Sequence, residues 1–145
     1  MLNPKVARFI FSLILVAMTV TGLSMGCGSN SEFPLVGNSK VAGADGMVHL
    51  EEIEGGNRMV TIKMNHLPPP DRLGAGMKTY IVWFISADDT ITKAGTLGFD
   101  PETREANMMA TTPMHRFKLK ITVEADPSVA EPTKSNVIAM REVSS

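Results

Sequence analysis

Alternation of apolar and polar residues is the dominant pattern of the chain after about residue 38. In Arg116–Glu124 every second residue, from Phe117 to Val123, is apolar, and Arg58–Asn65 follows the same period of two. Such alternation predicts strands with one buried face. Residues 79–86 differ, because both faces of this segment are apolar. They therefore predict a central strand that is covered on both sides.

Glycine, aspartate and asparagine separate these segments at short intervals. Residues 43–46 and 55–57 have the residue types that tolerate the positive φ of tight turns. Further strands are predicted at residues 39–42, 47–54, 93–99, 105–110 and 137–143. About seven or eight short strands with frequent turns predict an all-β fold, an antiparallel two-sheet sandwich that is immunoglobulin-like in broad shape.

The first 26 residues have a different character. Lys5 and Arg8 precede the apolar residues 9–20, and small and polar residues follow at positions 21–26. This order is typical of a secretory signal peptide, for which we expect a signal helix. The apolar run is shorter than the ~20 residues that cross a membrane. A retained anchor is the alternative interpretation of the same segment.

Cys27 is the only cysteine of the chain, and it lies just past the apolar run, directly after the small and polar residues 21–26. The sequence from Leu23 to Gly26 resembles the lipobox of bacterial lipoproteins, with a small residue before the cysteine. Leu23 lies four residues before Cys27, one more than is usual in that family. The resemblance implies that Cys27 becomes an acylated N-terminus and holds the protein to a membrane. Acylation would also remove an otherwise unpaired thiol from an oxidising compartment.

These features predict three regions: a lipoprotein signal peptide at residues 1–26, the acylated cysteine and a flexible tether at 27–37, and the sandwich domain at 38–145. Residues 28–32 are small and polar, which favours a flexible tether. Without residues 1–26 the chain keeps 12 basic residues against 15 acidic ones. This weakly acidic balance argues against nucleic acid as a partner, and it leaves the acyl chains to bind the membrane.

Four segments, KTYIVWFIS, KAGTLGF, FKLKITVEAD and EPTKSNVI, together resemble the extracytoplasmic domain of anti-sigma-K-type factors. The resemblance covers roughly residues 45–143 and implies a β-sandwich outside the cytoplasmic membrane, in the bacterial cell envelope. The sigma-binding helical domain of that family has no counterpart in this sequence, so sigma binding is not expected. The residues at the matching positions are Tyr80, Trp83, Gly95, Phe117, Thr122, Glu124, Pro132 and Thr133.

No catalytic motif stands out in the chain. His49, His66 and His115 lack the spacing of a metal-binding motif, and no Gly-x-Ser-x-Gly element is present after the predicted signal peptide, residues 1–26. Asp88 and Asp89 are adjacent, which is more typical of a turn than of a catalytic pair. We therefore expect a protein that is not an enzyme and that needs no cofactor.

A basic stripe is the first candidate site. Arg116, Lys118 and Lys120 alternate with apolar residues along one predicted strand, so their side chains share a face about 7 Å apart. The stripe would dock an acidic envelope protein, or it is simply a solvated surface. The predicted function is accordingly a lipid-anchored binding or sensing module, with its domain in the periplasm or at the cell surface.

A cluster of thioether side chains and an imidazole is the second candidate site. Met108, Met109, Met114 and His115 lie within eight residues of one another. Thioether and imidazole ligands suit Cu(I), which makes a periplasmic Cu(I)-handling protein the alternative function. The competing interpretation is that these methionines fill a core, as flexible methionine side chains commonly do.

Overall fold

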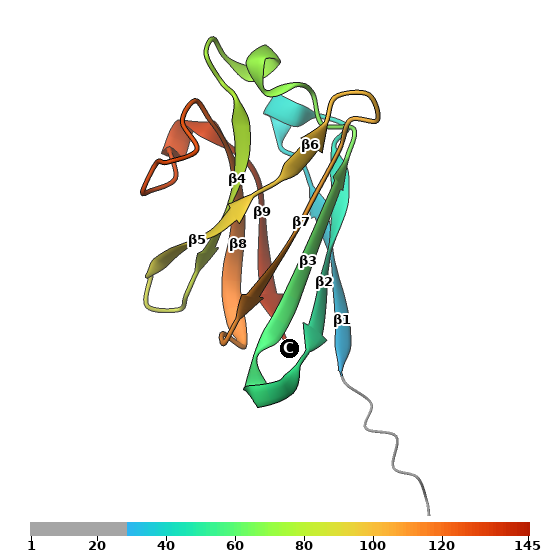
Figure 1. Ribbon diagram of the computed structural model, residues 1–145, viewed down its shortest axis with the longest axis vertical. Helices are drawn as coiled ribbons and strands as arrows, with labels where there is room; N and C mark the ends of the chain where they lie inside the picture. Colours follow the sequence, from blue (N-terminus) through green and yellow to red (C-terminus); the bar gives the residue numbers. More distant parts are fainter. Residues whose placement is uncertain (1–28) are drawn as a thin grey trace, which may run out of the picture.

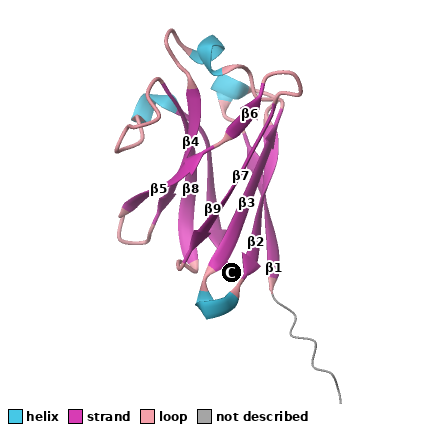
Figure 2. Ribbon diagram, viewed as in Figure 1, coloured by secondary structure: helices cyan, strands magenta, loops and turns pink. Residues whose placement is uncertain are grey.

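The computed structural model describes residues 29–145 as two antiparallel β-sheets packed face to face (Figure 1, Figure 2), which confirms the predicted all-β sandwich. The signal helix predicted for residues 1–26 and the acylation predicted at Cys27 lie outside the described residues. The first sheet has the order β1-β2-β3-β7-β6, formed by Asn30–Val36, Asp45–Glu52, Arg58–Asn65, Glu105–Thr112 and Gly98–Asp100. The second sheet has the order β5-β4-β8-β9, formed by Ile91–Thr96, Thr79–Ile85, Arg116–Glu124 and Val137–Ser144. Four short 3-10 turns connect the strands: η1 Ser39–Val41, η2 Glu54–Gly56, η3 Pro70–Leu73 and η4 Lys134–Asn136.

The core lies between the inner faces of the two sheets. Every second residue of β8 from Phe117 onward is buried there, as the alternation of this strand predicts. Phe84 of β4 packs against Phe117 with a ring-centroid separation of 4.7 Å. Burying one such side chain completely contributes roughly 1.5–3 kcal/mol, so this apolar layer is the main source of stability. Its members from the first sheet include Leu35, Val48, Leu50, Val60, Ile62, Met64 and Ala106.

The outer face of β4 is also covered, which confirms the prediction of a doubly buried central strand. Trp83 is 0% exposed, and its indole N–H donates a 2.9 Å hydrogen bond to the Thr122 hydroxyl on β8. The loop between β8 and β9 is tied to the same face, because Lys93 Nζ donates to the carbonyl oxygens of Pro127 and Val129. Lys93 Nζ also lies 5.7 Å from the centroid of the Trp83 ring. The indole is thereby enclosed by a strand, a loop and a lysine.

Glu124 fixes the end of the same loop. Its carboxylate accepts hydrogen bonds from the backbone N–H and the hydroxyl of Thr133, at 2.9 and 2.8 Å, and from Asn136 at 3.5 Å. Burial alone would raise the pKa of Glu124, but the hydrogen bonds from Thr133, Thr122 and Asn136 outweigh it and hold the pKa below its usual value of 4.5. The buried carboxylate is therefore a charged clamp that closes the loop.

The prediction of a flexible tether over residues 27–37 is wrong for most of that segment. Asn30–Val36 forms β1, which pairs along its whole length with residues 45–51 of β2. Phe33 and Leu35 point toward the core, and Leu35 is only 1% exposed. Pro34 is accommodated because β1 is an edge strand, where a residue can lack the N–H that a ladder requires. The folded domain therefore begins at β1 and not at residue 38.

Two other segments also differ from their predictions. Residues 39–42 were predicted as a strand, but Ser39–Val41 is a 3-10 turn whose Asn38 side chain caps the Lys40 N–H. The predicted strand at residues 93–99 divides into β5 in one sheet and β6 in the other. The crossing is marked by a register shift opposite Val82 and Trp83, in the neighbourhood of Gly95. A short turn and a change of sheet both break the simple period of two.

The two sides of the sandwich are closed in different ways. On one side β1 meets β9, where the Asn38 N–H donates to the Ile138 carbonyl and Gly37 bridges Ala139. On the other side the chain crosses from β5 to β6, and β5 faces β7 without pairing to it. The second side is therefore the open edge of the sandwich.

Candidate functional site

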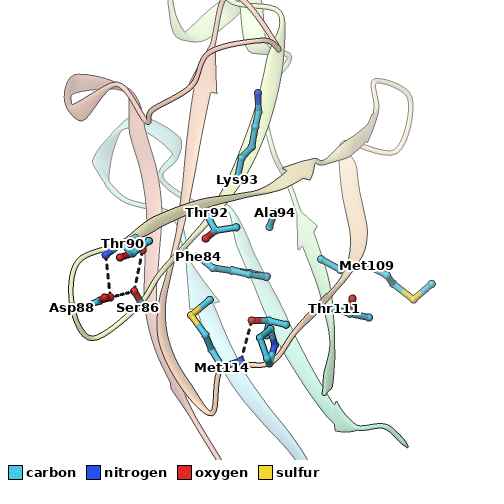
Figure 3. A pocket seen from close by; sticks show the side chains of 13 residues that line it. Phe84, Ser86, Asp88, Thr90, Thr92, Lys93, Ala94, Met109, Thr111 and Met114 are labelled. Carbon is cyan, nitrogen blue, oxygen red and sulfur yellow. Dashed lines mark hydrogen bonds between the residues drawn. The ribbon is translucent and has the colours of Figure 1, made fainter. Parts of the chain in front are cut away.

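A groove lies along this open edge, between β5 and the lower half of β7 (Figure 3). Its volume is about 610 Å³, within the range of small-molecule and peptide sites. The backbone of the loop from β4 to β5 borders one end, and the turn from β7 to β8 borders the floor. The lining side chains combine hydroxyls with methyl groups, one aromatic ring and two thioethers.

The groove exists because small side chains occupy positions that face the core. Ala94 of β5 and Ala110 of β7 are only half-buried, although they face the space between the sheets. Thr92 and Thr112 line the same space. Alanine and threonine cannot fill an interior that larger residues fill elsewhere in this core. Phe84 is therefore left at the base of an open channel, beside Met114 (Figure 3).

Asp88 is the acid at the end of the groove. The Ser86 hydroxyl donates a hydrogen bond to its carboxylate, and the Thr90 N–H donates another at 3.3 Å. The hydrogen bond from Ser86, followed by those from Thr90, holds the pKa of Asp88 below its usual value. Asp89 sits in the left-handed region with φ 64°, at the tight corner of the same loop. The adjacent acids therefore form a turn, and Asp88 serves as its internal cap.

The predicted Cu(I) ligands are divided between two faces. Met108 and Met109 are neighbours on β7, so their side chains point to opposite sides of the sheet. Met108 packs against the core, whereas Met109 is 68% exposed. Met109 and Met114 both line the groove, but in Figure 3 only the Met114 thioether points into it. His115 is exposed and is not among the lining residues. The structure therefore does not bring the four side chains together around one point.

The basic stripe lies on the outer face of β8, where the alternation places all three side chains. Arg116 is exposed, and Lys118 Nζ lies 3.8 Å from the carboxylate of Glu142 on β9. Exposed pairs of this kind contribute roughly 0–1 kcal/mol. Lys120 is half-buried, at the register position next to Trp83. Because Glu142 offsets part of its charge, the stripe is less cationic than its sequence suggests.

The three histidines lie at separate places. His49 Nδ1 is 3.4 Å from a Glu32 oxygen, and His66 Nδ1 is 2.8 Å from an Asp45 oxygen. The hydrogen bond with His66 lowers the pKa of Asp45. Within residues 29–145 no group of three or more His, Cys, Asp or Glu side chains is arranged to hold a metal ion. In the same part of the chain, no helix has the length and apolarity needed to cross a membrane.

Arg58 is a buried charge that the sequence analysis did not single out. It occupies the first position of β3 on the core face and is 5% exposed. Its Nε donates a 2.9 Å hydrogen bond to the Ser145 hydroxyl. Its Nη1 has no hydrogen-bond partner in the part of the chain that the structure describes. The sequence did offer a signal for this buried charge, because Arg58 occupies an inward position in the alternation of its strand.

Comparisons of this chain with protein families, with curated proteins and with solved structures found no match. The resemblance to anti-sigma-K-type domains therefore stays a prediction. Several of the positions that carry it have a structural role here, because Trp83 is bonded to Thr122 and Glu124 to Thr133. The fold and the groove define the class of the protein as a β-sandwich with one open edge.

Proposed function

We propose that this protein is a lipid-anchored β-sandwich of the bacterial envelope that binds a partner and catalyses no reaction. One observation carries the proposal: the first strand begins at Asn30, only three residues after Cys27. Three residues span at most ~11 Å. Acyl chains on Cys27 would thus hold a folded domain directly at the membrane surface, because only two residues separate Cys27 from the first strand.

The strand pairing indicates which end of the domain would face the membrane. Asn30 pairs with Glu51 and Arg58 with Glu52, so the start of β1 lies beside the connection of β2 and β3. The last residues of β9 lie at the same end (Figure 1), whereas the loop between β8 and β9 lies at the other. A domain held in this way meets partners at a high effective concentration, which suits weak interfaces.

Binding is favoured over catalysis by the character of the groove. Hydroxyl and methyl groups dominate its walls, and its one carboxylate, that of Asp88, accepts hydrogen bonds within its own loop. A general base works best with a pKa near the working pH, but the hydrogen bonds from Ser86 and Thr90 hold the pKa of Asp88 below its usual value. An open, mixed-polarity groove is suited to contact a chain segment or a small ligand without chemistry.

Labelling with palmitate tests the anchored part of this proposal. The full chain should incorporate labelled palmitate in a bacterial host, and Cys27→Ala should incorporate none. Ser29→Ala, two residues further along, is the matched control and should be labelled as strongly as the unchanged chain. Label that persists in Cys27→Ala would refute the lipid anchor.

A further inference from the structure

The lower half of β7 has a partner strand on one side only. Residues 106–112 pair with β3, but β6 pairs with residues 105–107 alone. Within the described part of the chain, residues 108–112 therefore have no strand on the side that faces the groove. In an antiparallel sheet every second residue directs its N–H and C=O to a given side. These backbone groups form a free hydrogen-bonding edge inside the groove.

The two strand edges that border the groove differ in their protection. β5 carries Lys93 and an irregular register beside Gly95, both of which discourage pairing with another strand. Residues 108–112 of β7, MMATT, have no charge, proline or glycine. Pro113 follows only at the end of the strand. The edge of β7 is therefore the one that is competent to accept a further strand.

The side chains around this edge leave room for such a strand. Ala94 of β5 and Ala110 of β7 both line the groove, and Phe84 and Met114 lie below Ala94 in Figure 3. An added strand would direct alternate side chains inward, over Phe84, and complete the core at this edge. The sandwich thus has space for one more strand beside residues 108–112 of β7.

We propose that the free edge of β7 at residues 108–112 binds an extended, uncharged segment of a partner protein, which adds as an antiparallel strand. Five residues of β7 match a segment about 17 Å long. Main-chain hydrogen bonds would supply affinity, and small or β-branched inward side chains would supply specificity. Because β5 borders the site opposite the free edge, a single strand fits better than the edge of a second folded copy. The inference deepens the proposed binding function and rests on it.

The C-terminal end offers a direct way to test this site. The Ser145 N–H donates to the His115 carbonyl at 3.2 Å, next to Met114 of the groove. An extension from Ser145 would enter at this end and run opposite to β7. We would therefore fuse Gly-Ser-Gly-Ser followed by Thr-Val-Thr-Val-Thr-Val to the full chain. Fusion raises the local concentration of the probe into the millimolar range, so that a weak site is still occupied.

Amide hydrogen exchange of the fused chain is the measurement. We expect exchange to slow at least ~10-fold at every second amide of residues 108–112, with a higher melting temperature. A control extension with proline at all six probe positions can donate no N–H and should change neither quantity. Unchanged exchange at residues 108–112 with the Thr-Val probe would overturn the proposal.

A blocking variant and an association measurement complete the test. Ala110→Phe should fill the groove and abolish the slowed exchange, while Met109→Phe, on the outer face of β7, should retain it. The comparison of the two extensions stands by itself if Ala110→Phe fails to fold. Dimerisation of the unfused chain that disappears in Ala110→Phe would show a second copy as the occupant and would overturn the proposal. Loss of acylation would leave these results unchanged, so the two proposals fail separately.

Discussion

Trp83, on the outer face of β4, is buried by contacts with a few individual residues. Trp83 has no solvent exposure, although it lies on the side of the sheet away from the core. Its enclosure depends on Thr122, Lys93 and the loop that Glu124 clamps. These residues stabilise a second, smaller layer over the sheet.

Trp83→Ala should therefore destabilise the protein by ~3–5 kcal/mol, because it empties a large enclosed site and leaves the Thr122 hydroxyl without its donor. Chemical denaturation of the folded chain measures this loss, and native fluorescence should be blue-shifted. Met109→Ala changes an exposed side chain and should stay within ~0.5 kcal/mol. Emission typical of indole in water would contradict the enclosure of Trp83.

Glu124 should make the stability of the protein sensitive to acid. Its folded pKa lies below the unfolded value, so its contribution is fully present above about pH 4.5 and is lost as the pH falls through the folded pKa. Glu124→Gln should lose ~1–3 kcal/mol at pH 7 and should show a weaker decline in stability below pH 4.5. Urea titrations between pH 3 and 7 measure both effects. Glu54→Gln, in the exposed turn η2, is the control, and an equal loss in both variants would contradict the clamp.

Arg58 is a buried charge whose Nη1 has no hydrogen-bond partner within residues 29–145, and replacing it tests whether that arrangement contributes to stability. Removing a buried charge that lacks an ion pair is often neutral or stabilising when an apolar side chain fills the space. Arg58→Met should therefore keep or raise the melting temperature. A fall by more than ~2 kcal/mol in the free energy of unfolding would show that Arg58 has a partner beyond Ser145.

At the scale of the element, a strict alternation of apolar and polar residues predicts the bounds of a strand correctly. β3 and β8 have the predicted bounds, because one inner and one outer face leave a single possible register. β1 was missed since Pro34 interrupts its pattern, although Phe33 and Leu35 already alternate. The groove was not predictable from the sequence, because it depends on β6 beginning only at Gly98 and on small residues from separate strands lining one space. The sequence predicts that the side chains of the basic stripe share one face of a strand. It does not predict the carboxylate of Glu142 beside Lys118, because Glu142 lies on another strand.

Two adjacent residues test whether Asn30–Val36 is a structural strand. Leu35→Ala should destabilise the domain by ~2–5 kcal/mol, since the side chain is 1% exposed. Val36→Ala, at the next position and 68% exposed, should have almost no effect. Equal stability of the two variants in denaturant titrations would mean that this segment is a tether after all.

At the scale of the whole molecule, the proposed anchor and the open edge belong to one small domain. The last residue, Ser145, lies at the same end of the sandwich as the start of β1, and Ala130 lies in the loop at the opposite end. The groove lies near the first of these ends, because the β7–β8 turn that borders it is hydrogen-bonded to Ser145. The binding edge would thus lie within reach of partners that are themselves at the membrane.

The distance of each end from the bilayer tests the central claim most directly. With Cys27 acylated as proposed, an introduced cysteine would be the only reactive thiol, so a fluorophore can be attached at Ser145→Cys or at Ala130→Cys in vesicle-bound protein. Energy transfer to a dye in the lipid headgroups should be clearly stronger from position 145 than from position 130. Equal transfer from both positions, or none from either, would contradict a domain held at the membrane by its first strand.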